Sequence, residues 1–135
     1  MSEYVLDASA LIAYLQQEPG WRRVESRIAQ QRCHLLAVNL AEVLTRLADW
    51  NVPVQDMKQR LDGLELIMAP FDEDLAVATA RLRPATRALG LSLGDRACLA
   101  LAQKLNAIAI TADRPWLNLD PALGIRVECL RPDAN

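Results

Sequence analysis

Residues 93–113, LGDRACLALAQKLNAIAITAD, join a long apolar segment to a short one, and their pattern indicates the fold. The polar residues of the first part, 93–105, are few: Asp95, Arg96, Gln103 and Lys104. This composition predicts a helix that is buried on most of its surface. Residues 107–110 predict a strand buried on both faces, which ends in Thr111-Ala112-Asp113. A buried helix followed directly by a buried strand favours a parallel sheet covered by helices.

The remainder of the chain repeats this alternation. We expect further strands at residues 4–6, 33–38, 64–69 and 125–127. We expect further helices around residues 11–15, 24–28, 39–48, 53–61 and 72–83, with breaks at Pro19-Gly20, Asn51-Pro53 and Pro84. The sequence therefore predicts one α/β domain over residues 1–135, with a mostly parallel four- to five-stranded sheet and helices on both faces.

The composition is that of an ordinary globular domain. Hydrophobic residues make up 52% and charged residues 24% of the 135 residues, which allows one domain with a core and excludes disorder. The sequence lacks the run of about 20 apolar residues that a membrane-spanning helix needs, and the basic start of a secretion signal. Its three cysteines lack C-x-x-C spacing, so we expect buried thiols in a cytoplasmic protein that contacts no membrane. The net charge of −2 excludes a uniformly basic surface for nucleic acid.

Four carboxylates are expected at one edge of the sheet. In an open parallel sheet, ligands bind outside the carboxyl ends of the strands. Asp7 follows the first strand and Asp113 follows the fourth. Glu42 and Asp95 each fall in the first turn of a helix predicted to start at this edge. We therefore expect the four side chains to converge.

Each of these acids also has a purely structural explanation. The segments Asn39–Glu42 and Ser92–Asp95 both have the spacing of a capping box, in which the acid binds a backbone amide at the helix start. Asp7 and Asp113 could each be the N-cap of the following helix. Glu42 also precedes Arg46 by four residues, the spacing of a helical ion pair. Spacing alone leaves both explanations open.

Four segments in order resemble the signature of PIN-domain ribonucleases, and among these the chain most resembles the VapC toxins of bacterial toxin–antitoxin pairs. The segments are Leu6–Leu11, Asn39–Val43, Leu91–Ala102 and Thr111–Arg114. The resemblance runs over essentially the whole chain, and its main departure is Pro115-Trp116. It implies that Asp7, Glu42, Asp95 and Asp113 form the family's catalytic, metal-binding quartet. It also implies that Ser9 supports the first aspartate.

The implied activity is a metal-dependent endoribonuclease that hydrolyses RNA phosphodiester bonds, with tRNA or other structured RNA as substrate. Clustered carboxylates repel one another, and a hard cation such as Mg²⁺ or Mn²⁺ relieves this repulsion. We expect Asp7, Asp95 and Asp113 to bind the metal. Glu42 would either bind it as well or orient the attacking water. Ser9 would hold Asp7 by a hydrogen bond.

Three residues near the acids are candidates for contact with RNA. Arg96 and Arg114 adjoin two of the acids and could contact phosphate. Trp116 could stack on an unpaired base. Each has a simpler explanation, because an exposed arginine commonly pairs with a nearby acid and a tryptophan beside an apolar strand commonly belongs to the core.

The resemblance also implies partners. Proteins similar to VapC hold a helix of a VapB-like antitoxin in a groove and commonly form homodimers, which can lie within a larger toxin–antitoxin complex. Here that groove is expected between the helices of residues 8–29 and those of residues 39–61. Trp21 and Leu40 are expected to be partly uncovered there.

Two other functions remain open at the level of sequence. One is a PIN nuclease that processes RNA without an antitoxin. The other is a non-catalytic α/β binding module whose acids only cap helices, in which case no divalent ion binds. Two further enzyme classes fit poorly. An aspartyl phosphatase needs a second acid at position 9, where Ser9 stands, and a Ser-His-Asp hydrolase or a zinc site would depend on the single histidine, His34.

Overall fold

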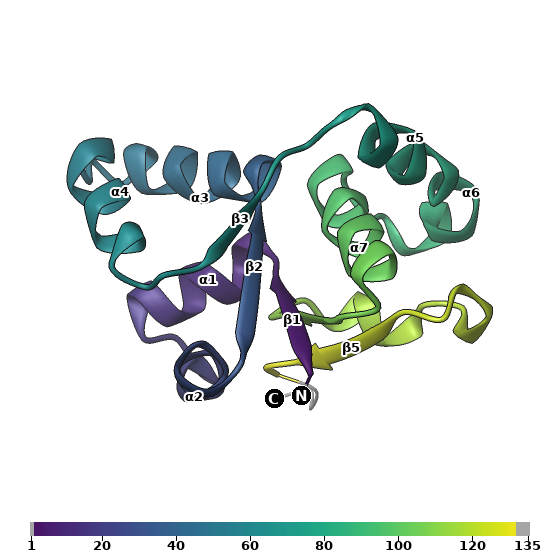
Figure 1. Cartoon of the computed structure of the whole chain (residues 1–135), viewed down its shortest axis with the longest axis horizontal. Coiled ribbons are helices and arrows are strands. Elements are labelled where there is room, and N and C mark those ends of the chain that lie inside the picture. Colours follow the sequence, from purple (N-terminus) through teal and green to yellow (C-terminus); the bar gives the residue numbers. More distant parts are fainter. Residues whose placement is uncertain (1, 132–135) are drawn as a thin grey trace.

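A computed structural model describes residues 2–131, in which five strands form one sheet in the order β3-β2-β1-β4-β5 (Figure 1). The strands are β1 (Glu3–Leu6), β2 (Arg32–Leu36), β3 (Ile67–Ala69), β4 (Ile108–Thr111) and β5 (Arg126–Cys129). Every pair of neighbouring strands is parallel. The expected α/β fold with a parallel sheet is confirmed, and the short last strand belongs to that sheet.

Helices cover both faces of the sheet. One face carries α1 (Ala8–Gln16), α2 (Trp21–Gln30), α3 (Ala37–Asp49) and α4 (Val54–Asp62), and the other carries α5 (Glu73–Arg81), α6 (Arg83–Thr86) and α7 (Leu93–Leu105). Three short 3-10 helices complete the described chain: η1 (Arg87–Leu89), η2 (Arg114–Asn118) and η3 (Pro121–Leu123). Among the described residues, no helix has the length and apolar character needed to cross a membrane.

The boundary between β2 and α3 differs from the prediction. The second strand was expected to reach residue 38 and the helix to open at Asn39, but the strand ends at Leu36 and the helix begins at Ala37. Apolar residues at 37 and 38 fit a strand end and a helix start equally well, so periodicity does not separate the two. Asn39 therefore lies within the first turn, and its buried side chain is free to bond to other groups.

Two other boundaries have local causes. The third strand was expected from residue 64, but Glu65 adopts a positive φ of 56° in a turn that delays β3 to Ile67. Pro84 ends the regular helix, as its sequence position predicts, because it lacks the amide that the next turn would need. The chain continues in the single turn of α6, where Pro84 stands in the first positions.

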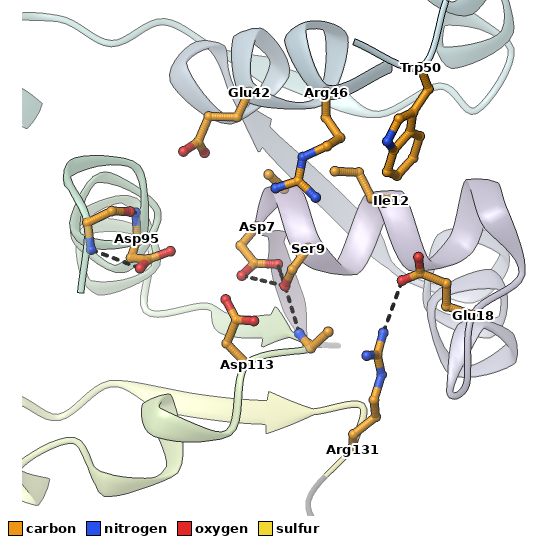
Figure 2. Close-up of a pocket in the computed structure, with 13 residues that line it drawn as sticks. Asp7, Ser9, Ile12, Glu18, Glu42, Arg46, Trp50, Asp95, Asp113 and Arg131 are labelled. Carbon is orange, nitrogen blue, oxygen red and sulfur yellow. Dashed lines mark hydrogen bonds and ion pairs between the residues drawn. The ribbon is translucent and has the colours of Figure 1, made fainter. Parts of the chain in front are cut away.

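The strand order reverses between β1 and β4, and this leaves a crevice at their carboxyl ends. After β1 the chain turns to α1 on one face, whereas after β4 it turns to η2 on the other. Such a switch point is where open α/β sheets bind ligands. Asp7 and Asp113 face each other across it (Figure 2).

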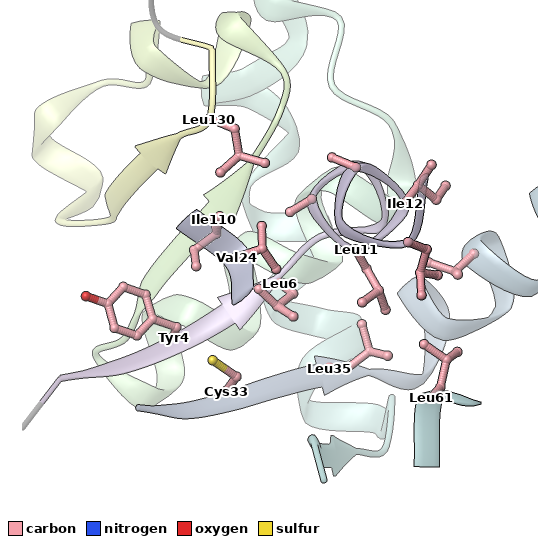
Figure 3. Packing of buried hydrophobic residues seen from close by; sticks show 14 of the residues in the cluster. Tyr4, Leu6, Leu11, Ile12, Val24, Cys33, Leu35, Leu61, Ile110 and Leu130 are labelled. Atoms are coloured by element: carbon pink, nitrogen blue, oxygen red, sulfur yellow. The ribbon is translucent and has the colours of Figure 1, made fainter. Parts of the chain in front are cut away.

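Two apolar cores hold this crevice in place. Tyr4 and Leu6 of β1 point to one face and Val5 to the other, as the alternation of a strand requires. Figure 3 shows the first core, where Leu6 packs against Leu11 of α1 and Val24 of α2. The second core is formed mainly by α7, whose boundaries match the predicted 93–105.

Candidate metal centre

A pocket of about 460 Å³ opens at the carboxyl ends of β1 and β4. All four predicted acids line it. Figure 2 shows its side chains, which include Asp7, Ser9, Glu18, Glu42, Arg46, Trp50, Asp95, Asp113 and Arg131. Most of these side chains are charged. The four acids therefore meet at one edge of the sheet, as the sequence predicts.

Three of the four acids form a tight cluster. Asp7, Asp95 and Asp113 each offer one carboxylate oxygen, and these oxygens all lie within 4.8 Å of one another. The three residues come from the end of β1, the first turn of α7 and the loop after β4. Glu42 lies outside this cluster and reaches the pocket from α3. The predicted quartet is therefore an arrangement of three acids and a fourth at the side.

Asp7 is buried and tightly held. It is 2% exposed, and its carboxylate accepts hydrogen bonds from the Ala10 amide at 2.7 Å and the Thr111 hydroxyl at 2.6 Å. The Ser9 hydroxyl, expected beside Asp7, lies 2.8 and 2.9 Å from its two oxygens. Burial raises the pKa of Asp7 to about 7, although the bonds from Thr111, Ala10 and Ser9 act to lower it. Asp7 is an N-cap of α1, but a cap needs no such burial.

Thr111 is a supporting residue that the sequence analysis missed. Its hydroxyl donates to Asp7 and accepts a hydrogen bond from the Asp113 amide at 3.0 Å. Ser9 makes a second link across the crevice, because its hydroxyl accepts from the Ala112 amide at 2.9 Å. The sequence contained a signal for Thr111: it is a polar residue at the end of an otherwise apolar strand, two positions before Asp113.

Asp95 combines a capping role with its place in the cluster. The predicted capping box is present: the Ser92 amide donates to Asp95 Oδ2 at 2.9 Å, and the Asp95 amide donates to the Ser92 hydroxyl at 3.2 Å. Only Oδ2 takes part in the capping box, so the other carboxylate oxygen of Asp95, Oδ1, makes no capping hydrogen bond. The structural explanation is therefore correct for Asp95 but does not exclude a second role.

Capping does not account for Asp113. It stands at the N-cap position of η2, yet within residues 2–131 its carboxylate makes no capping bond. Partial enclosure in the pocket raises its pKa, and the negative charge of Asp95 raises it further. Asp113 thus keeps a carboxylate with raised pKa next to two others, without structural benefit to its own helix.

Glu42 is positioned from within α3 and not by a capping box. Because α3 begins at Ala37, Asn39 is not the N-cap, and that alternative is wrong. Instead, Asn39 Nδ2 donates to Glu42 Oε1 at 2.9 Å and to the Gly94 carbonyl at 3.1 Å. The Glu42 carboxylate lies against Gly94, where a Cβ atom would collide with it. The other structural explanation was an ion pair between Glu42 and Arg46, and within residues 2–131 these two side chains form no salt bridge.

The three predicted RNA contacts do not line the pocket. Arg96 donates to the Thr79 carbonyl at 3.1 Å, on the side of α5. Trp116 is 1% exposed and belongs to the second core, so it has no free ring face for stacking. Arg114 is exposed at the start of η2. For Trp116 the core explanation is the correct one, whereas partly buried Arg96 bonds to a backbone carbonyl and not to the nearby acid expected of it.

The pocket contains instead an arginine and a tryptophan that the sequence analysis did not select. Arg46 and Trp50 follow Glu42 at intervals of four residues on α3, a spacing that places them on the same helix face. That spacing was visible in the sequence. Arg131 also lines the pocket, where it donates to Glu18 at 3.2 Å, and only the folded chain brings these two together.

The donor set fits a hard divalent cation. The cluster offers only carboxylate oxygens, which Mg²⁺ and Mn²⁺ prefer, whereas the common zinc sites include histidine or cysteine among their ligands. His34 is remote from it and bonds to Glu3 at 2.8 Å. The raised pKa values of Asp7 and Asp113 indicate that the ionised cluster is unfavourable without a counter-charge. A cation would supply that charge.

Comparisons with known proteins agree with this arrangement. A family model described as PIN domain matches residues 4–120. The structure is similar to that of VapBC2 from Rickettsia felis bound to a promoter DNA fragment, with 15% identity, a TM-score of 0.73 and coverage of 94% of this chain and 98% of that one. It is also similar to VapBC-5 from Mycobacterium tuberculosis, with 28% identity, a TM-score of 0.61 and coverage of 96% and 99%. A search of curated protein sequences finds no match.

Proposed function

The chain belongs to the PIN domain family of nucleases, and from this premise we propose that it is a VapC-type toxin, an endoribonuclease that depends on Mg²⁺ or Mn²⁺. The observation that carries the proposal is the cluster of Asp7, Asp95 and Asp113, whose oxygens lie within 4.8 Å of one another. The similarity to VapBC structures over nearly the whole chain supports a toxin rather than another PIN nuclease. Structured RNA such as tRNA is the proposed substrate class.

The three clustered aspartates would hold the cation. When bound, it would activate a water molecule and offset the negative charge that develops on the phosphoryl oxygens. Glu18 and Arg131 of the lining pair and cancel, so the four predicted acids, when ionised, and Arg46 would give the pocket three net negative charges and repel phosphate. One divalent cation would leave a single negative charge, and two would leave a single positive one. The proposed metal dependence follows from this balance.

The remaining polar residues have distinct proposed roles. Ser9 and Thr111 fix the orientation of Asp7 through their hydroxyl groups. Glu42 lies beside the cluster, with one oxygen held by Asn39, and its carboxylate would accept a proton from the attacking water. Hydrolysis then places the hydroxyl of that water on phosphorus, breaks the bond from phosphorus to the leaving sugar oxygen, and requires that solvent deliver a proton to that oxygen.

The proposed partners are a VapB-like antitoxin and a second copy of the chain. VapBC complexes are the subject of several similar structures, and this supports the proposal. Trp21 and Leu40, expected in the antitoxin groove, are both partly buried side chains. Co-expression with the product of the adjacent gene tests the first partner. Light scattering of the purified complex and of the free chain tests the second.

Cleavage of total RNA, with tRNA included, tests the activity. The protein would be freed of any partner and incubated with Mg²⁺, Mn²⁺ or EDTA, alongside a folded Asp95→Asn variant. Asparagine can still accept the capping bond from Ser92 while losing the charge. We expect discrete cuts that need the metal and disappear in the variant. Absence of cutting by the wild-type protein with either metal would overturn the proposal.

A further inference from the structure

The face of α3 that looks into the pocket carries a stripe of three unlike side chains. Glu42, Arg46 and Trp50 are spaced by four residues, and all three line the pocket. Figure 2 shows them extending from α3 toward the side where Asp7 and Ser9 lie. Glu42 is close to the proposed reaction, so the two others extend the site along α3, away from α7.

Trp50 is a large ring that the fold does not bury. It is 45% exposed and is not part of either apolar core. Tryptophan is highly buried on average, whereas Trp50 lies exposed in the lining of a polar pocket, where its ring is accessible to a ligand. The Arg46 guanidinium lies 5.9 Å from the centre of its ring, which brings a cation and an aromatic surface together.

Two arginines line the described pocket, and Arg46 is the one whose guanidinium can bind an anionic ligand. Within the described residues it forms no salt bridge, whereas Arg131, the other arginine of the lining, is paired with Glu18. Figure 2 shows Arg46 between Glu42 and Trp50 along α3, with its guanidinium directed toward the side of the pocket where Asp7 and Ser9 lie.

We propose that Arg46 and Trp50 form a subsite for an unpaired nucleotide adjacent to the scissile bond, with Arg46 donating to a phosphate and Trp50 stacking on the base. This inference rests on the proposed nuclease function and specifies its substrate. The pocket volume of about 460 Å³ is sufficient for a nucleotide-sized ligand.

The subsite distinguishes single-stranded from double-stranded RNA. A base inside a duplex has both faces covered by its neighbours, so only an unpaired or splayed-out base can stack on the ring. The protein would then prefer single-stranded segments and loops of structured RNA. Stacking is tolerant of base identity, so the subsite contributes affinity and position more than sequence preference.

Binding measured without cleavage tests the subsite. The probe is a fluorescein-labelled single-stranded oligoribonucleotide of about ten nucleotides, titrated in Ca²⁺ and followed by anisotropy. Stacking of one base corresponds to roughly 1–3 kcal/mol, so Trp50→Ala should weaken binding roughly 5- to 150-fold, and Trp50→Phe should keep most of the affinity. Arg46→Gln should weaken binding and reduce the salt slope by about 0.7.

Matched controls come from outside the pocket. Leu117 is an exposed apolar side chain (48%), and Arg81 is an exposed arginine of α5, so Leu117→Ala and Arg81→Gln should leave binding unchanged. A duplex of the same sequence should bind more weakly and be insensitive to Trp50→Ala. Arg46→Gln should bind Mn²⁺ at least as tightly as the wild-type protein, because the substitution removes a positive charge from the pocket.

The outcomes separate this inference from the proposed function. If the wild-type protein cuts RNA but Trp50→Ala and Arg46→Gln bind the probe normally, the subsite is wrong and the nuclease stands. The same holds if Trp50→Ala impairs only the binding of a partner protein. If the two variants weaken binding but no metal supports cleavage, the subsite stands and the nuclease proposal falls. A wild-type protein that does not bind the probe overturns the subsite.

Discussion

The two sides of the pocket are built in different ways. The strand-end side consists of Asp7, Ser9, Thr111 and Asp113, and the α3 side consists of Glu42, Arg46 and Trp50. On the strand-end side, Asp7 is 2% exposed and accepts hydrogen bonds from the Ala10 amide and the Ser9 hydroxyl of α1 and from the Thr111 hydroxyl of β4. On the α3 side, all three side chains are exposed, and Asn39 gives Glu42 a single supporting hydrogen bond.

This difference assigns different tasks to the two sides. Metal ligands must be held at fixed positions, and supporting hydrogen bonds are the means by which proteins achieve this. Long exposed side chains with few contacts can adjust to a substrate. The strand-end side therefore suits the proposed metal, and the α3 side suits the proposed attacking water and RNA. Each prediction below alters one side and measures whether the other is affected.

The largest effect is expected from Asp7→Asn, with Asp72→Asn as the matched control. Both aspartates follow a strand and cap a helix, since Asp72 accepts from the Leu75 amide at 2.9 Å as Asp7 does from Ala10. If capping were the whole role of Asp7, the two variants would differ only in stability. We expect cleavage to fall by at least about 10³-fold, about 4 kcal/mol, in Asp7→Asn and to be retained in Asp72→Asn. Initial rates of RNA cleavage measure this.

A dependence of stability on pH is the next largest effect. The pKa of Asp7 is about 7 in the folded protein against an ordinary value of 3.8, so between these pH values the native state holds a proton that the unfolded chain has lost. The free energy of unfolding of the metal-free protein should therefore fall as pH rises through this window, by an upper bound of about 4 kcal/mol.

Urea unfolding in EDTA at pH 5 and pH 8 measures this dependence, with Asp7→Asn as the reference. The wild-type protein should lose stability relative to the variant at pH 8, and Mn²⁺ should restore it. An unchanged difference between the two proteins at the two pH values would contradict the assigned burial of Asp7.

Thr111→Val tests the support of the strand-end side. The substitution keeps the shape but removes the hydroxyl that donates to Asp7 and accepts from the Asp113 amide. Loss of such a supporting group should lower metal affinity and cleavage by about 10- to 100-fold. Thr86→Val is the control, because Thr86 is equally buried but bonds only to carbonyl groups of its own segment. Equal activity of the two variants would argue against a role for Thr111.

Gly94→Ala should produce the smallest effect on cleavage, and it acts on the α3 side because it displaces the Glu42 carboxylate. A Cβ at position 94 collides with the end of the Glu42 side chain, which can move aside. Alanine is better than glycine in a helix by about 1 kcal/mol, so the melting temperature should not fall. Cleavage should fall roughly tenfold while Mn²⁺ binding is kept. Gly63→Ala, at the end of α4, is the control. Full activity of Gly94→Ala would contradict the proposed role of Glu42 in accepting a proton from the attacking water.

Much of the fold was predictable because its core segments are strongly patterned. The apolar stretches at 93–105 and 107–110 correspond to α7 and β4 with a difference of at most one residue at each end. The position of Asp7 and Asp113 at the strand ends follows from the parallel sheet. The position of Asp95 in the first turn of α7 was also predicted, and the structure adds that Asp95 joins the tight cluster whereas Glu42 lies outside it.

The rest of the site depends on contacts between distant segments. A single sequence does not reveal that the amide of Asn39 bonds to Gly94 of another helix, or that Thr111 bonds to Asp7. It also does not reveal which tryptophan is buried, because Trp50 and Trp116 both follow apolar segments. Proximity to Asp113 favoured Trp116, but the ring that reaches the pocket is that of Trp50.

The central claim is that the clustered aspartates bind a divalent cation, and Mn²⁺ titration followed by electron paramagnetic resonance tests it most directly. The titration would compare the wild-type protein, Asp7→Asn and Asp72→Asn at pH 8 without nucleic acid. We predict that the wild-type protein and Asp72→Asn bind Mn²⁺ with equal affinity and that Asp7→Asn binds at least about tenfold more weakly. Equal binding by Asp7→Asn and the wild-type protein, or no binding by either, would contradict the claim.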